Sequence, residues 1–117
     1  MAEALGREGA DLMLVDLLDS VADAAERLDE QLPGSVIAQR CDVTDAGQVA
    51  GVFDRVADEL GTATILVNAA GIASNEPALI VAPEQWRKVL DVNITGTFLP
   101  CQACPRPGEC RAHRLHR

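Results

Sequence analysis

Three short apolar runs in this sequence each end in a side chain that can take part in recognition or catalysis. Asp16 closes the first run, Asp42 lies near the end of the second, and Asn68 follows the third. A carboxylate in such a place can accept hydrogen bonds from both hydroxyls of a ribose or from the amino group of a base. The third run, Thr64 to Gly71, ends in two alanines and a glycine, so little side-chain bulk keeps a ligand from the backbone. These residue types favour binding of a nucleotide.

Each of these residues also has a plainer structural interpretation, which the sequence leaves open. Asp16 can be a solvated strand end or the residue that starts the next helix. Asp42 can simply assist a helix cap at Thr44. The stretch from Thr64 to Gly71 can be an ordinary strand exit with a turn glycine.

The elements that would position these residues alternate along the chain. Apolar spacing, caps and Pro/Gly stops predict helices over 1–7, 18–32, 44–60 and 83–98, and strands over 11–16, 36–43 and 64–67. Alternating strands and helices predict a parallel sheet with right-handed crossovers. Ligands bind beyond the carboxyl ends of such strands, which is where Asp16, Asp42 and Asn68 stand.

A further polar residue, Asn93, lies within the last predicted helix. It is in phase with Trp86, Leu90 and Thr97, so we expect it on or near the inward face. An amide buried there needs hydrogen-bond partners, and a neighbouring backbone segment is the simplest source of them.

Composition narrows the functional classes. A chain of 117 residues with 48% hydrophobic content predicts one small globular domain. The net charge of −8 argues against nucleic acid as a partner, because no basic stripe is present to neutralise phosphates. No apolar run has the length of a membrane helix, and the N-terminus has no long apolar stretch of a signal peptide. We therefore expect no membrane partner and a cytoplasmic location. The four cysteines, three of them crowded near the end, do not make the spaced framework of a small secreted domain, so we expect a reduced compartment.

Four stretches together resemble the short-chain dehydrogenase/reductase family in order and spacing. They are Leu-Val-Asp16, Cys-Asp42-Val43-Thr44-Asp45, Leu-Val-Asn68-Ala-Ala-Gly71 and Val92-Asn93-Ile-Thr-Gly-Thr-Phe98. The resemblance covers roughly Ala2 to Gln102. It implies a Rossmann fold, which is a doubly wound parallel sheet in three α/β/α layers, and hydride transfer between NAD(P) and a small-molecule alcohol or carbonyl substrate.

The resemblance also implies a role for each matching position. Asp16 would be the acid that binds the ribose and favours NAD over NADP, and Asp42 and Val43 would contact the adenine. Asn93 matches the family's helix asparagine, the one catalytic position present, which helps to hold the catalytic lysine through water. The full set of implied cofactor-binding residues is Asp16, Leu17, Asp42, Val43, Asn68, Ala69, Ala70 and Gly71. No metal ligand is implied in this set.

The sequence departs from the family pattern in ways that bear on activity. The glycine-rich loop and the first strand would lie upstream of Met1, so the expected fold is a partial Rossmann fold without them. The usual Asn-Asn-Ala-Gly is Asn68-Ala-Ala-Gly71 here. The sequence has no tyrosine and no lysine after Lys88, so the catalytic Ser and the Tyr-x-x-x-Lys pair are missing. We expect a truncated chain that is inactive by itself.

The strand order of the family predicts a further consequence. The first strand lies between the second and the fourth, so its absence would leave the strand at 64–67 without a neighbour. Unpaired apolar edges of this kind invite aggregation or a partner chain.

Composition changes near residue 100. We assign residues 1–99 to a partial NAD(P)-binding domain and residues 100–117 to a basic tail rich in Cys and Pro. One hypothesis for the tail is a zinc site formed by Cys and His residues at short spacing, namely Cys101, Cys104, Cys110, His113 and His116. The rival hypothesis is a shifted reading frame near Cys101 to Ala103. The codons permitted for Arg111 to His116, when displaced by one base, can encode Gly-Arg-Ile-Val-Ser. That peptide resembles the next strand of the family.

The alternative function is a non-catalytic nucleotide-binding or subunit-interaction fragment, with zinc in the tail. A homo-oligomer is compatible with both, since intact relatives often associate through the helix that contains Asn93. The sequence specifies neither the substrate nor the oligomeric state.

Overall fold

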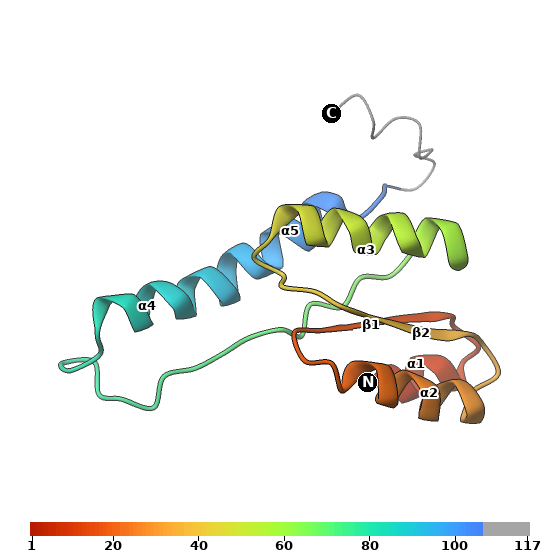
Figure 1. Ribbon diagram of the computed structural model, residues 1–117, viewed down its shortest axis with the longest axis horizontal. Helices are drawn as coiled ribbons and strands as arrows, with labels where there is room; N and C mark the ends of the chain where they lie inside the picture. The colour runs from red at the N-terminus through yellow and green to blue at the C-terminus, as the bar shows by residue number, and fades with distance from the viewer. Residues whose placement is uncertain (107–117) are drawn as a thin grey trace.

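The computed structural model describes residues 1–106 of the chain. Helices and strands alternate through its first half and are followed by a long loop and one long, composite helix (Figure 1). The elements are α1 (Ala2–Arg7), β1 (Leu12–Asp16), α2 (Val21–Gln31), β2 (Val36–Arg40), α3 (Ala46–Glu59), α4 (Pro83–Leu90), the π-helix η1 (Asp91–Thr95) and α5 (Gly96–Ala103).

The sheet of the described residues has two parallel strands, β1 and β2, in a register that runs from Leu12 opposite Val36 to Asp16 opposite Arg40. Helices α1 and α2 cover one face, and α3 and α5 lie over the other (Figure 1). The predicted α/β organisation in three layers is therefore confirmed.

Side-chain alternation along β1 explains the two faces. Leu12 and Leu14 belong to the cluster formed with α1 and α2, whereas Met13 packs against the cluster under α3. Both faces of β1 are apolar because a parallel strand is covered on both sides. The α3 cluster has the helical spacing that the sequence predicts, and its buried members are Cys41, Val49, Val52, Phe53 and Val56.

The start of α3 differs from the prediction by one residue. Asp45, not Thr44, is the N-cap, and its carboxylate accepts a hydrogen bond from the backbone N–H of Gln48 at 3.0 Å. Thr44 instead takes part in a turn closed by Asp42. The predicted stop at Gly61 holds, since this residue has a φ of 94°, which glycine adopts without the clash of a Cβ.

The predicted third strand is wrong as a strand. Residues 64–67 belong to no sheet in the structure, and Ile65 and Val67 are 67% and 44% exposed. Leu66 alone of this run packs against the α3 cluster. A strand is defined by pairing, and this segment pairs with neither β1 nor β2.

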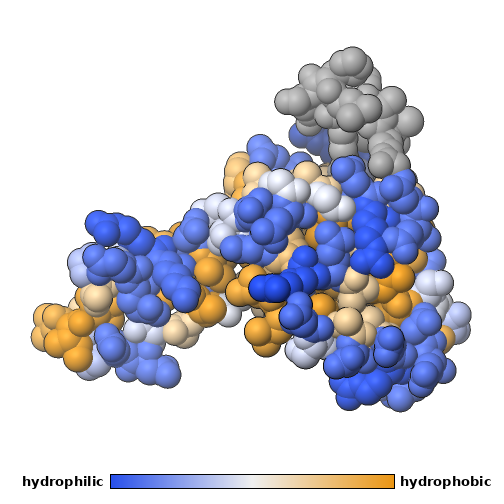
Figure 2. All heavy atoms as spheres, in the orientation of Figure 1, coloured by the Kyte–Doolittle hydropathy of each residue, from blue (hydrophilic) through white to orange (hydrophobic). Residues whose placement is uncertain are grey.

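The long helix also faces differently from the prediction. Trp86 is 58% exposed and Phe98 57% exposed, and Asn93 is exposed rather than buried. Trp86 is exposed because α4 projects past the end of the sheet (Figure 1). Figure 2 shows apolar surface at this projecting end, where α4 and the preceding loop expose Leu79, Ile80 and Trp86.

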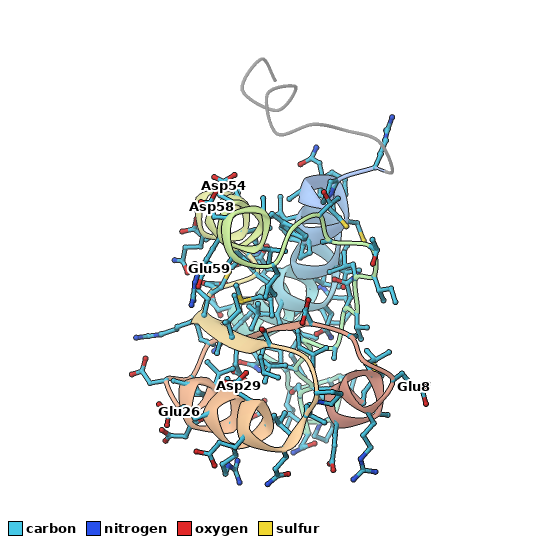
Figure 3. All side chains as sticks on the ribbon, turned by 90° about the vertical axis from the view of Figure 1, so that its right-hand side faces the viewer. Glu8, Glu26, Asp29, Asp54, Asp58 and Glu59 are labelled. Carbon is cyan, nitrogen blue, oxygen red and sulfur yellow. The ribbon has the colours of Figure 1, made fainter. Side chains whose placement is uncertain are left out.

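Acidic side chains dominate the outer surfaces of the helices. Figure 3 shows Glu26 and Asp29 on α2, and Asp54, Asp58 and Glu59 on α3, with Glu8 just after α1. Asp29 also accepts a hydrogen bond from the backbone N–H of Val36 at 2.8 Å, so this acid supports the start of β2.

Helix α5 continues through residues 100–103, across the change in composition near residue 100. The division into a domain and a tail stays a prediction. Among residues 1–106, no three His, Cys, Asp or Glu side chains are grouped to hold a metal ion, and three of the five proposed zinc ligands, Cys110, His113 and His116, lie outside the described residues.

The described helices include none with the length and apolar character needed to cross a membrane.

Candidate functional site

The carboxyl ends of β1 and β2 lie side by side. Asp16 and Arg40 are partners in the register, and the backbone N–H of Cys41 donates to the carbonyl oxygen of Asp16 at 2.9 Å. Asp16, Leu17, Asp42 and Val43 are therefore brought together at one edge, as the sequence predicts for a parallel sheet.

The carboxylate of Asp16 is exposed, and its Oδ1 accepts a hydrogen bond from the backbone N–H of Leu18 at 3.1 Å. The nearby Arg40 guanidinium is directed elsewhere. Its Nε donates to the carbonyl oxygen of Leu17 at 2.9 Å, and its Nη1 lies 3.6 Å from Asp19. The end of β1 thus presents an oriented carboxylate beside the half-exposed side chain of Leu17.

Asp42 is held by a tight turn. Its Oδ1 accepts hydrogen bonds from the Thr44 hydroxyl at 2.6 Å and from the Thr44 backbone N–H at 2.9 Å. These two donors lower the pKa of the Asp42 carboxyl, because they stabilise its ionised form. Next to it, burial and the charges of Asp42 and Asp45 raise the pKa of the Cys41 thiol. At neutral pH this strand end carries a fixed negative charge beside a neutral thiol.

Asn93 joins the loop after residue 71 to the long helix. Its Nδ2 donates to the carbonyl oxygen of Ile72 at 2.8 Å, and its Oδ1 accepts from the backbone N–H of Ile72 at 2.8 Å. The expectation that this amide satisfies a neighbouring backbone describes the geometry well. Asn93 lies in the π-helix η1, a type of turn that is frequent at functional sites.

Two glycines allow the long helix to approach both loops closely. A Cβ on Gly71 would lie 3.2 Å from the Asn93 Oδ1, and a Cβ on Gly96 would lie 2.6 Å from the Val43 Cγ2. Gly71 is thus needed by the asparagine as well as by any ligand. Gly96 lets the first turn of α5 touch the valine at the end of β2, so one helix supports both loops.

Asn68, at the start of the loop, donates from its Nδ2 to the Cys101 Sγ at 3.3 Å. Ala69 and Ala70 are exposed. The structure therefore places the predicted loop residues 68–71 against the same long helix that contacts Val43.

Sequence reasoning missed Gly96, Ile72 and Cys101 as parts of this arrangement. A glycine inside a helical pattern is a signal of close packing, so Gly96 could have been found. Ile72 contributes only its backbone, for which no sequence signal exists.

The site is an open surface rather than an enclosed cavity. The hollow of about 600 Å³ found on the molecule belongs to another part of the long helix, and none of the predicted site residues lines it. Its lining residues are Arg87, Lys88, Leu90, Asp91, Ile94 and Thr95.

The residue types at the strand ends suit part of a dinucleotide. The strand ends supply one exposed carboxylate for ribose hydroxyls, and a second carboxylate with a valine for a base. Phosphates need a turn of unpaired backbone N–H groups at a helix start. The described residues before β1 form α1 and the turn at Gly9 instead.

The sequence matches the family model described as enoyl-(acyl carrier protein) reductase over residues 1–111. It is 43% identical over 106 residues to the D-threitol dehydrogenase of Mycolicibacterium smegmatis, an alignment that covers 88% of this chain and 40% of that protein. The chain belongs to the short-chain dehydrogenase/reductase family. It is also 33% identical over 108 residues to the L-2,3-butanediol dehydrogenase of Corynebacterium glutamicum, with 91% and 42% of the two chains covered.

Solved structures of family members agree with this assignment. The L-sorbose reductase from Gluconobacter frateurii, complexed with NADPH and L-sorbose, superposes with a TM-score of 0.81 at 31% identity, over 88% of this chain and 40% of that one. A short chain dehydrogenase from Mycobacterium smegmatis gives 0.82 at 30% identity, over 87% and 43%. The fold is part of a Rossmann-type fold, and the chain spans about two fifths of the length of the curated relatives it matches.

Proposed function

We propose that this chain carries the adenosine-binding surface of an NAD-dependent oxidoreductase that acts on a small-molecule alcohol or carbonyl compound. The observation that supports this most is the meeting of the β1 and β2 ends, where the carboxylates of Asp16 and Asp42 lie on neighbouring strands. Family membership supports the class of reaction. The relatives named above are dehydrogenases and a reductase.

The carboxylate of Asp16 favours NAD over NADP. It can accept hydrogen bonds from two ribose hydroxyls, and it would repel the extra phosphate that NADP carries at the 2′ position. Arg40, the nearest cation in the register, is engaged with the Leu17 carbonyl oxygen and with Asp19. No hydrogen bond or ion pair between Arg40 and Asp16 is seen among the described residues.

Asp42, Val43 and the loop 68–71 would complete the cofactor surface. Val43 would pack on the adenine, and the ionised Asp42 would accept a hydrogen bond from the adenine amino group. The small residues from Asn68 to Gly71 would let the cofactor approach the backbone. Asn93 would keep this loop in place through the two hydrogen bonds to Ile72.

The bound dinucleotide supplies the hydride in this class of reaction. Carbonyl reduction also needs a proton donor, for which this sequence offers no tyrosine and, after Lys88, no lysine. We therefore propose that the 117-residue chain by itself does not turn over substrate.

The experiment pairs a binding assay with an activity assay. Purified chain is titrated with NAD and NADP by calorimetry, and NADH formation is followed with a panel of polyols, secondary alcohols and hydroxysteroids. We expect binding that is tighter for NAD, with no turnover. Turnover by the chain alone would overturn the proposed inactivity, whereas tighter binding of NADP would overturn the role of Asp16.

A second candidate function is that of a subunit-interaction fragment. Exposed apolar side chains favour this candidate. Ile65, Ile94 and Phe98 are 67%, 62% and 57% exposed. Ile94 and Phe98, four positions apart on the composite helix, lie on the same face, and exposed apolar patches mark interaction sites. Light scattering and the calorimetric titration together distinguish the two candidates. An interaction fragment without nucleotide affinity would associate with itself or a partner in light scattering and would give no heat with NAD in calorimetry.

A further inference from the structure

Two cysteines close the last helix, and the proposed oxidoreductase surface makes no use of their sulfur chemistry. Cys101 lies in the last turn of α5 and is exposed, and Cys104 is the C-cap residue of the same helix. The backbone N–H of Cys104 donates to the carbonyl oxygen of Pro100 at 2.9 Å, which keeps the turn helical up to the cap. Both residues are thiols in the structure.

Helix geometry meets the Cα criterion for a disulfide between these two residues, while their Cβ atoms, about 5–6 Å apart at this spacing, must come closer by a small rearrangement of the last turn. Residues three apart in an α-helix have Cα atoms about 5 Å apart, given the rise and radius of the helix. Disulfides join residues whose Cα atoms are roughly 4.4 to 6.8 Å apart. The extended backbone of Cys104, with φ −61° and ψ 128°, lies outside the helix and can adjust to the bond.

Cys101 is also tied to the proposed cofactor loop. The Nδ2 of Asn68 donates to the Cys101 Sγ at 3.3 Å, across 33 positions of sequence. Cys104 is the neighbour of Cys101 one turn further along the helix surface, and it packs against the α3 cluster. A bond to Cys104 would turn the sulfur of Cys101 toward that cluster and away from Asn68.

We propose that Cys101 and Cys104 form a reversible disulfide, and that its formation releases Asn68 and loosens the loop 68–72. The oxidant is a small-molecule disulfide. The thiolate of the exposed Cys101 attacks one sulfur of that disulfide, and the other sulfur leaves as a thiolate. The thiolate of Cys104 then attacks the Cys101 sulfur and expels the second small thiolate. In sum, two protein thiols are oxidised, one small disulfide is reduced to two thiols, and the protons of the protein pass to the departing thiolates.

The disulfide itself does not depend on the function proposed above, but an effect on NAD binding does. Its chemistry also differs from the zinc hypothesis, since two thiols suffice for a disulfide whereas a tetrahedral zinc site takes four ligands.

The test uses the full chain with Cys110→Ser, which removes the third thiol near the C-terminus. The protein is equilibrated with reduced and oxidised glutathione at a series of ratios, the remaining thiols are alkylated, and peptides are mapped by mass spectrometry. We expect an internal link between Cys101 and Cys104, with the buried Cys41 still reduced. In the added Cys104→Ser variant, glutathione should stay attached to Cys101. The proposal would be overturned if Cys101 and Cys104 were both alkylated at every ratio of reduced to oxidised glutathione. It would also be overturned if the parent protein carried glutathione on Cys101 without the internal link.

Hydrogen exchange tests the connection to the loop. Oxidation should speed exchange of the Ile72 amide, the hydrogen-bonded amide of this loop, several-fold. Asn68→Ala should show this faster exchange before oxidation and no further change after it. Unchanged exchange in the oxidised parent protein would overturn the link to Asn68. Failure of NAD binding with the disulfide still formed would count against the proposed function alone.

Discussion

Replacing Asn93 by alanine should release the loop after residue 71 from the long helix. The substitution removes two hydrogen bonds of 2.8 Å, one to the backbone N–H and one to the carbonyl oxygen of Ile72. A hydrogen bond contributes about 1 kcal/mol net. Asn93 is exposed, so water can replace both partners and no desolvation penalty is added. The expected loss is about 2 kcal/mol of local stability.

The Ile72 amide reports this loss directly, since its N–H is one of the two partners. About 2 kcal/mol corresponds to roughly 30-fold faster opening, and hydrogen exchange measured by NMR would follow that opening. In Asn93→Asp the Ile72 amide should exchange at a rate between those of the parent chain and Asn93→Ala. A carboxylate still accepts from the Ile72 N–H but cannot donate to the Ile72 carbonyl oxygen. Asn75→Ala, an exposed asparagine of the same loop, is the matched control. Unchanged Ile72 exchange in Asn93→Ala would refute the clamp.

Three more predictions concern the strand ends. Gly96→Ala should lower the free energy of unfolding by about 1 kcal/mol, measured in urea, because the new Cβ would lie 2.6 Å from the Val43 Cγ2 and overpacking outweighs the better helix propensity. Thr44→Val should raise the pKa of Asp42 toward its ordinary value, observed by NMR titration of the carboxyl carbon, since the hydroxyl donor is lost. Because its pKa is lowered in the folded state, Asp42 contributes stability above about pH 4, and this contribution is lost as the pH falls through the pKa of the folded state. In Thr44→Val this contribution of Asp42 should be smaller. Asp16→Ser should reduce the preference for NAD over NADP by about tenfold in calorimetry, because a charge that repels the 2′-phosphate is removed.

Matched substitutions serve as controls for these three. Gly51→Ala in α3 should raise stability by up to about 1 kcal/mol, since the nearest atom to its new Cβ is the Gln39 Nε2 at 3.9 Å. An equal loss at both glycines would contradict the packing argument for Gly96. Thr44→Ser keeps the hydroxyl and should leave the Asp42 pKa lowered. Asp19→Ser removes a neighbouring acid outside the strand end, so a shift in cofactor preference as large as that of Asp16→Ser would point to net charge instead.

Much of the fold follows from periodicity in the sequence. The buried side chains of α3 recur at helical spacing. Two short apolar runs of the sequence form β1 and β2, with Asp16 as the last residue of β1 and Asp42 just after β2. Local chemistry also fixes the turn at Gly61, where a positive φ suits glycine.

The failures arise where structure depends on distant neighbours. Residues 64–67 have strand composition but form no strand, because a strand needs a paired neighbour; the strand order of the family, and not the local sequence, predicted that this neighbour would be missing. The exposure of Trp86 depends on whether a layer lies beneath α4. The helical period does place Asn93 in phase with the buried Gly96 and Pro100, and its amide faces the loop at Ile72. Local sequence does not report how far that loop covers the side chain.

The most direct test of the cofactor surface is an NMR titration of the isotope-labelled chain with NAD. Binding at the proposed surface predicts chemical-shift changes that cluster at residues 16–17, 42–43 and 68–72, and that are weaker with NADP at equal concentration. Shift changes confined to other residues, or none at millimolar NAD from a chain that is folded by its amide spectrum, would contradict it.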